Sequence, residues 1–152
     1  MFRPSNGVWY IWNSTAGFSA AQFGISTDNP VPADYDGDGK TDLAVFRRGA
    51  HSTWYILQSS DNSFRAVRWG ASNDEQAILF DTPVPADYDG DGKADLAVWR
   101  MTGAISSPAY FLILQSSDNS VRAQQWGTTD SDSPVPADYD GDGKTDLAVY
   151  RS

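Results

Sequence analysis

The stretch Pro30–Lys40 reads PVPADYDGDGK, and the same letters return at Pro83–Lys93 and Pro134–Lys144. Each copy continues with Thr or Ala, then DLAV, an aromatic residue and Arg. The first Asp of the copies, at positions 34, 87 and 138, recurs after 53 and 51 residues. A period of about 50 residues is typical of β-propellers, in which one repeat forms one blade, and not of short-period solenoids. We therefore interpret residues 1–152 as a single repeat array, with units at about 2–45, 46–98 and 99–152.

Four short apolar runs, separated by turn residues, make up one unit of the repeat. They are Val84–Asp87, Asp95–Trp99, Trp54–Leu57 and Phe64–Trp69. The runs are rich in Val, Ile and aromatic residues, and no segment keeps a helical spacing of apolar residues, which predicts an all-β chain. The first run contains a proline in every copy, at Pro32, Pro85 and Pro136, and proline is tolerated in a strand only at a sheet edge. We therefore predict four-stranded β-propeller blades in which the first run lines the central channel.

The chain begins and ends at the same point of its repeat, because Phe2-Arg3 aligns with Tyr150-Arg151. We expect two complete blades and two complementary half-blades, which together amount to three blades per chain. The N-terminal half-blade covers residues 5–24, with runs at Val8–Asn13 and Phe18–Phe23, and the C-terminal half-blade covers residues 134–151, with runs at Val135–Asp138 and Asp146–Tyr150.

Three blades cannot close a ring, because closed propellers hold about four to eight. Two chains joined head to tail supply six blades, and their half-blades cover each other's open edges. We therefore predict a homodimer that closes one six-bladed ring, in which residues 5–24 of one chain pair with residues 134–151 of its neighbour. The alternative is that the chain is a piece of a longer array.

The repeated acidic loop DYDGDGKTD has the composition of a calcium site. Its carboxylates fall at positions 1, 3, 5 and 9, with Gly at position 6 and a free backbone carbonyl from Lys at position 7. Oxygen ligands at alternate positions, with a Gly that permits a sharp turn, suit Ca²⁺ better than the tighter octahedral Mg²⁺. The loop is not an EF-hand, since Val replaces the Glu of position 12 and the flanks are strands. The alternative is an Asp-Gly turn without metal, in which repulsion between the carboxylates destabilises the hairpin.

These motifs resemble the bacterial FG-GAP-like or VCBS-type repeats, which are related to the propeller of integrin α-subunits. The resemblance rests on the acidic loop, on the opening at Phe2–Ile11 and on the aromatic-Gly pairs at Phe23-Gly24, Trp69-Gly70 and Trp126-Gly127. No Gly-Ala-Pro follows, so the resemblance is to the calcium-bearing bacterial branch and says little about integrin-type ligand binding. It implies side-chain ligands at Asp34, Asp36, Asp38 and Asp42, at Asp87, Asp89, Asp91 and Asp95, and at Asp138, Asp140, Asp142 and Asp146, with backbone carbonyl ligands at Lys40, Lys93 and Lys144. About three Ca²⁺ ions per chain are thus expected.

The composition of the chain limits its possible partners, cross-links and cellular location. The chain has 20 acidic against 11 basic residues, a net charge of -9 and no cysteine. The acidity disfavours nucleic acid and anionic lipid as partners, and the absence of cysteine excludes disulfides and thiolate metal sites. The sequence contains no apolar run long enough to cross a membrane. It opens without signal-peptide features, so we expect a mature chain, a piece of a larger protein or an intracellular one. Cytosolic calcium would leave such loops empty, and we therefore favour an extracellular or cell-surface location.

Catalysis has little support in the sequence. His51 is the only histidine and occurs in one hairpin alone, which disfavours a His-based nucleophile relay. We expect a non-enzymatic, calcium-stabilised scaffold or interaction module whose partners are itself and a protein or glycan. The alternative is a multivalent lectin with sugar sites between blades, since a propeller lectin that binds N-acetylglucosamine looks similar at the acidic loop, and a calcium-dependent hydrolase is the third hypothesis. Insertions at residues 71–83 and 101–110 either pack on the ring or form a contact patch.

Overall fold

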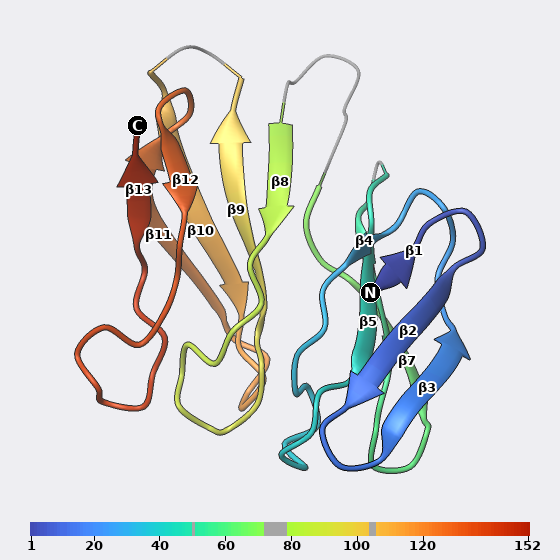
Figure 1. The fold of residues 1–152 in the computed structure, drawn as a ribbon. Helices are drawn as coiled ribbons and strands as arrows, with labels where there is room; N and C mark the ends of the chain where they lie inside the picture. The colour runs from blue at the N-terminus through green and yellow to red at the C-terminus, as the bar shows by residue number, and fades with distance from the viewer. Residues whose placement is uncertain (50, 72–78, 104–105) are drawn as a thin grey trace.

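The computed structural model describes residues 1–49, 51–71, 79–103 and 106–152. Over these residues the chain is built from strands and turns and contains no helix, which confirms the prediction of an all-β chain. No helix that could span a bilayer is found in the described part. The strands form four antiparallel sheets that stand side by side (Figure 1).

Two of the sheets have four strands each. The first full sheet consists of β4 (Asn29–Pro30), β5 (Leu43–Arg47), β6 (Thr53–Leu57) and β7 (Phe64–Arg68) in that order. The second full sheet consists of β8 (Leu79–Pro83), β9 (Leu96–Thr102), β10 (Pro108–Leu114) and β11 (Val121–Thr128). Each sheet is a meander in which consecutive strands are neighbours, as expected for one repeat unit.

The chain ends form two smaller sheets. The N-terminal sheet contains β1 (Phe2–Arg3), β2 (Val8–Asn13) and β3 (Gly17–Gln22), and the C-terminal pair contains β12 (Asp132–Pro134) and β13 (Val149–Arg151). In the repeat, β2 and β3 correspond to the third and fourth strands of a full sheet, and β12 and β13 to the first and second. The short β1 also corresponds to the second strand, and the predicted half-blade of residues 5–24 did not include it. The two ends lie on opposite sides of the array (Figure 1).

The first strand of each unit is placed earlier than predicted. The runs from Val31, Val84 and Val135 were expected to be strands, whereas β4, β8 and β12 end at the proline that precedes each run. The run itself makes only an isolated bridge, Ala33 to Asp42 in the first full sheet, and one backbone bond from Val31 to Ala44. Pro32 lacks an N–H and cannot continue the ladder. The prediction that this run is a strand is therefore wrong, although its edge position is retained.

The core lies between neighbouring sheets. Phe46 of β5 and Trp54 of β6 are fully buried, as are Ile56 and its counterpart Ile113 in β10. Phe46, Trp54 and Ile56 share a cluster with Leu96 of the following sheet, and Leu147 and Val149 pack against the cluster of Ile113. Each full sheet therefore buries its apolar face against the next one. The apolar residues of β5 and β9 are continuous because both faces are covered.

Parts of the two predicted insertions are strands. Residues 79–83 form β8, and residues 101–102 and 108–109 lengthen β9 and β10 beyond their counterparts in the first full sheet. The remaining insertion residues 72–78 and 104–105 lie outside the described residues. Whether either insertion forms a contact patch stays a prediction.

Candidate metal centre in the acidic loops

Loop 1 (residues 34–42), loop 2 (residues 87–95) and loop 3 (residues 138–146) connect the first strand of a unit to the second, and all lie at one end of the sheets (Figure 1). In loop 1 the chain folds around Asp34, whose carboxylate accepts hydrogen bonds from the backbone N–H of Gly37 (2.7 Å) and Gly39 (2.8 Å). Both glycines have positive φ, 82° and 80°, which side chains strongly disfavour. The Gly-x-Gly spacing of the motif is therefore a requirement of the turn.

In each loop, carboxylates that are distant along the sequence come together. Oxygens of Asp34, Asp36 and Asp42 lie within 4.8 Å of one another, and the same holds for Asp87, Asp89 and Asp95 and for Asp138, Asp140 and Asp146. Two oxygens bound to one Ca²⁺ at about 2.3–2.6 Å can be at most about 5.2 Å apart. The all-oxygen chemistry and the spacing of each triad therefore fit one calcium ion.

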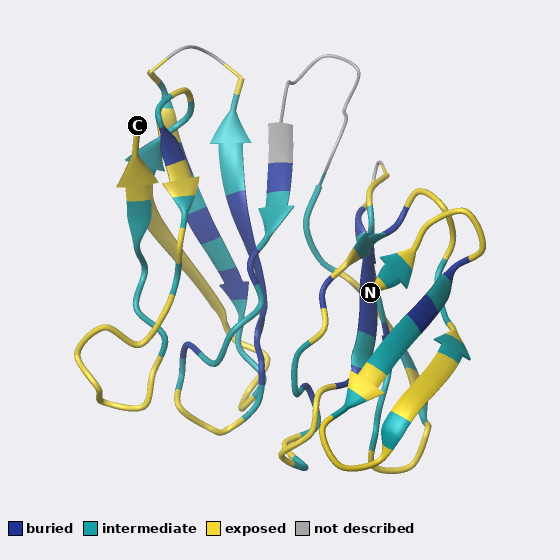
Figure 2. Cartoon of the chain, viewed as in Figure 1, coloured by how far each residue is buried: buried dark blue, intermediate teal, exposed yellow. Residues whose placement is uncertain are grey.

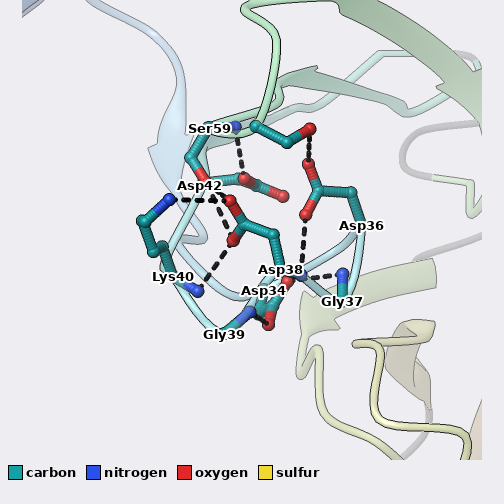
Figure 3. A network of polar contacts seen from close by, with 9 residues as sticks. Asp34, Asp36, Gly37, Asp38, Gly39, Lys40, Asp42 and Ser59 are labelled. Atoms are coloured by element: carbon teal, nitrogen blue, oxygen red, sulfur yellow. Dashed lines mark hydrogen bonds and ion pairs between the residues drawn. The ribbon is translucent and has the colours of Figure 1, made fainter.

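The third Asp of the motif does not join these triads. Asp38 accepts hydrogen bonds from the backbone N–H of Lys40 (2.8 Å) and from the Ser59 hydroxyl (3.1 Å), and it pairs with the Lys40 ammonium (3.2 Å) (Figure 3). The bond from the Lys40 backbone, with smaller contributions from the Lys40 and Ser59 side chains, lowers the pKa of Asp38. Ligation by Asp38, Asp91 and Asp142, and by the backbone carbonyls of Lys40, Lys93 and Lys144, stays a prediction.

The last Asp of the motif ties the loop to the core. Asp42 is fully buried and accepts the backbone N–H of Tyr35 (2.9 Å) and of Ser59 (2.7 Å). Asp95 has the same environment in loop 2, and its burial raises the pKa of its carboxyl group. A buried carboxylate in this position is costly when charged and gains most from a bound cation.

Two serines in the hairpin between the third and fourth strands complete loop 1, and two complete loop 2; they were not predicted. In loop 1 the Ser60 hydroxyl donates to Asp36 (2.7 Å), in addition to the bond from Ser59 to Asp38. In loop 2 Ser116 donates to Asp91 and Ser117 donates to Asp89. The signal was present, since QSSDNS occurs in both hairpins. Such hydroxyls orient the carboxylates without being ligands themselves.

Adjacent loops are joined to one another by backbone contacts. The N–H of Ala94 in loop 2 donates to the carbonyl of Asp34 in loop 1 (2.7 Å), and the N–H of Thr145 in loop 3 donates to the carbonyl of Asp87 in loop 2 (2.7 Å). The Lys93 side chain also covers Gly37 of the preceding loop, 3.1 Å from the place of a Cβ. The loops therefore form a continuous row along one end of the array.

Loop 3 has the same sequence as loop 1 but a different environment. Tyr35 and Tyr88 are 3% and 2% exposed, whereas their counterpart Tyr139 is 64% exposed. Figure 2 shows loop 3 exposed along most of its length. Asp140 and Asp142 receive no serine hydroxyl among the described residues, while Asp138 is bonded to its glycines as in the other loops.

The repeated arginines have acidic partners that sequence reasoning missed. Arg47 makes two parallel bonds to Asp28 (2.7 and 2.9 Å), and Arg100 and Arg151 do the same with Asp81 and Asp132. Each of these arginines pairs with an Asp that lies just before or within the first strand of its own sheet. The signal was an Asp two residues before the proline that opens each copy.

Comparison with known families matches residues 34–98 to the FG-GAP-like repeat. The chain carries an FG-GAP-like repeat. The match begins at the first Asp of loop 1 and ends in β9, so it contains loops 1 and 2 and the whole hairpin between them. Neither curated proteins nor solved structures gave a match to the chain. The predicted resemblance is therefore confirmed at the level of the repeat.

Proposed function

We propose that the chain is a non-enzymatic, calcium-binding module of β-propeller blades that serves as an extracellular scaffold or interaction unit. The carboxylate triads carry this proposal, because each gathers oxygens from three Asp residues within 4.8 Å. Such a cluster is unfavourable without a cation, since each carboxylate raises the free energy of ionising the others. The FG-GAP-like repeat over residues 34–98 supports the same interpretation.

The residues that would hold the ion are the triads, with the buried Asp42, Asp95 and their counterpart Asp146 anchoring each site to a strand. A bound Ca²⁺ would supply electrostatic cross-linking of the loop, in place of a disulfide, in a chain that has no cysteine. The chain's own groups already fix the carboxylates, because Gly37 and Gly39 hold Asp34 while Ser60 holds Asp36. The proposed role of the metal is therefore to stabilise the row of loops.

Calorimetric titration with Ca²⁺ and thermal melts with and without EDTA test this proposal. If each site has a dissociation constant of about 0.1 mM, millimolar calcium adds about 1.4 kcal/mol per site. For a chain of this size, EDTA should lower Tm by roughly 10 °C. Asp36→Asn should remove about one site from the titration.

The matched control is Asp61→Asn, which removes an exposed charge outside the loops and keeps the turn bond to Ser63. It should leave the calcium titration unchanged. A chain that binds no Ca²⁺ at millimolar concentration, with an EDTA-independent melt, would establish the loops as metal-free Asp-Gly turns and overturn the proposal.

A further inference from the structure

We propose that loop 3 and the C-terminal pair are completed by the N-terminal sheet of a second copy of this chain, with Ser14 and Thr15 of that copy donating to Asp142 and Asp140. This inference names the partner of the proposed propeller module and rests on its blade organisation, but not on the metal. The two full sheets serve as internal templates, because they contain the contacts that we assign to the chain ends.

Equivalent apolar residues are buried in two copies of the repeat and exposed in the third. Val31 and Val84 are 5% and 8% exposed, but Val135 is 41% exposed. The same contrast separates Phe46 and Trp99, at 0% and 2%, from Tyr150, at 63%. Apolar side chains that are core in two settings are expected to be covered in the third.

The two full sheets show which residues would cover these exposed side chains. Tyr35 lies against Trp54 of its own sheet, with ring centroids 6.5 Å apart, and shares a core cluster with Ala94 and Leu96 of the next sheet. The repeat alignment gives Trp9, Thr41 and Leu43 as the counterparts of these three residues. Trp9, Thr41 and Leu43 line a single hollow of about 600 Å³ beside β2. That hollow is the place in which Tyr139 of another copy would fit.

Polar side chains at the two chain ends differ in their contacts from their counterparts in the full sheets. Ser14 and Thr15 follow β2 as Ser59 and Ser60 follow β6. Both are exposed, and in the described part of the chain neither hydroxyl makes a hydrogen bond. Among the described residues, no serine donates to Asp142 or Asp140 as Ser59 and Ser60 donate to Asp38 and Asp36. The free hydroxyls beside β2 and the carboxylates of loop 3 are therefore complementary as donors and acceptors.

The row of loops continues across the same junction. Asp34 and Asp87 each accept a backbone N–H from the following loop, and the corresponding donor for Asp138 is the N–H of Thr41 in a second copy. Gly37 and Gly90 are covered by Lys93 and Lys144, whereas Gly141 has no atom within 4 Å of the place of a Cβ and would be covered by Lys40. All of these contacts belong to one arrangement, in which the second copy follows loop 3 as the second full sheet follows loop 1.

Strand β1 has to separate from β2 for this junction to form. β1 pairs with β2 through Phe2 to Trp9 and Arg3 to Val8, and the templates pair Phe46 with Trp54 and Trp99 with Phe111. Tyr150 of a second copy therefore takes the place of Phe2 beside Trp9. In the first full sheet this pairing extends over Leu43–Arg47, so the incoming β13 segment replaces a shorter strand with a longer one.

Cross-linking tests the junction directly, because the chain has no native cysteine. The template pair Leu43 to Leu57 corresponds to Leu147 of one copy and Trp12 of the other, and directly opposed residues are close enough for a disulfide. Leu147→Cys combined with Trp12→Cys should give a covalent dimer after oxidation. A ladder of longer oligomers, a covalent trimer or a purely monomeric product would each overturn the two-copy ring.

Paired serine variants test the assigned donors. Ser14→Ala/Thr15→Ala should raise the dimer dissociation constant at least tenfold in sedimentation experiments, because each lost bond is to a charged acceptor. The same variant should leave the melt of the dissociated chain unchanged. The matched control, Ser59→Ala/Ser60→Ala, should destabilise the chain itself instead.

Calcium titration and sedimentation of the unmodified chain separate the two proposals. If loops 1 and 2 still bind Ca²⁺ while the chain stays monomeric at every concentration, the metal proposal stands and the inference about the second copy fails. If the dimer forms and calcium does not bind, the reverse holds. Unchanged dimerisation in Ser14→Ala/Thr15→Ala would overturn the assignment of these donors.

Discussion

The guanidinium of Arg100 is held by two parallel hydrogen bonds to the carboxylate of Asp81, each 2.8 Å long. The Asp81 side chain is fully buried, and the Arg100 side chain is 23% exposed. Asp81 also accepts the backbone N–H of Ala71 (2.6 Å), which lies after the last strand of the preceding sheet. The pair therefore fixes the first strand of the second full sheet against the end of the first full sheet.

We predict that Asp81→Asn destabilises the chain by about 2–3 kcal/mol, because it leaves a partly buried guanidinium without its charge partner. The exposed edge of Arg100 keeps the cost below that of a fully buried pair. The fall in Tm should be about 5–10 °C. Asp61→Asn is the control, and an equal change in both variants would contradict the role of the pair.

The counterpart Asp132 gives a prediction for acid unfolding. Hydrogen bonding from Arg151 lowers the pKa of Asp132, so the folded chain binds this proton less readily than the unfolded chain. The resulting stability is present above the unfolded pKa of about 3.9 and is lost as the pH falls toward the lower folded value. We expect the free energy of unfolding to decrease as the pH drops below about 4.

Denaturant melts between pH 5 and pH 2 in EDTA measure this effect, since EDTA keeps calcium loss from contributing. Asp132→Asn removes the titrating group and should have a shallower pH dependence than the wild-type chain. Parallel curves for the two chains would show that another carboxylate governs acid unfolding.

Gly70 supports a third prediction. It follows β7 with a φ of +100°, and a Cβ at this position would lie 2.9 Å from a carboxylate oxygen of Asp81. Gly70→Ala combines backbone strain with this clash and should cost about 2 kcal/mol or more. Gly17→Ala is the matched control, because Gly17 has a φ of +74° and no atom within 4 Å of its Cβ position. The difference in Tm between the variants isolates the clash.

The local features of the fold could be predicted from the sequence because the repeat presents each of them several times. Val8–Asn13 was predicted as a strand with the same bounds as β2, and the acidic motif placed Asp34, Asp36 and Asp42 in one loop. The position of β4 could not be predicted, because the run after Pro30 has the composition of a strand but only a single bridge. Apolar composition does not report which backbone groups find partners.

The contacts that join separate parts of the chain were the ones missed. Asp28 and Arg47 are 19 residues apart, and the Ser60 contact to Asp36 spans 24 residues. No local pattern states such pairings, since they depend on the register of the meander. Comparison of the copies contained the information, because an acid and a serine pair recur at matching positions, but only the fold shows which groups they meet.

An indole N–H meets the same backbone carbonyl in each unit, although it comes from different strands. Trp54 of β6 donates to the carbonyl of Trp69 (3.0 Å), whereas in the second full sheet Trp99 of β9 donates to that of Trp126 (3.1 Å). The cross-strand pairs are Phe46 with Trp54 and Trp99 with Phe111. The Trp and Phe have therefore exchanged strands while the hydrogen bond is kept.

We predict that Trp99→Phe costs about 2–3 kcal/mol, because it removes both the hydrogen bond to Trp126 and buried volume. Adding Phe111→Trp recreates the arrangement of the first full sheet and should recover at least about 1 kcal/mol, measured as a coupling energy in a double-mutant cycle. Trp69→Phe is the control, because the buried Trp69 indole N–H has no hydrogen-bond partner in the described structure, and the substitution should cost less than Trp99→Phe. If the effects of Trp99→Phe and Phe111→Trp are additive, the shared carbonyl does not couple the two strands. The second full sheet would then be held at this point by packing alone.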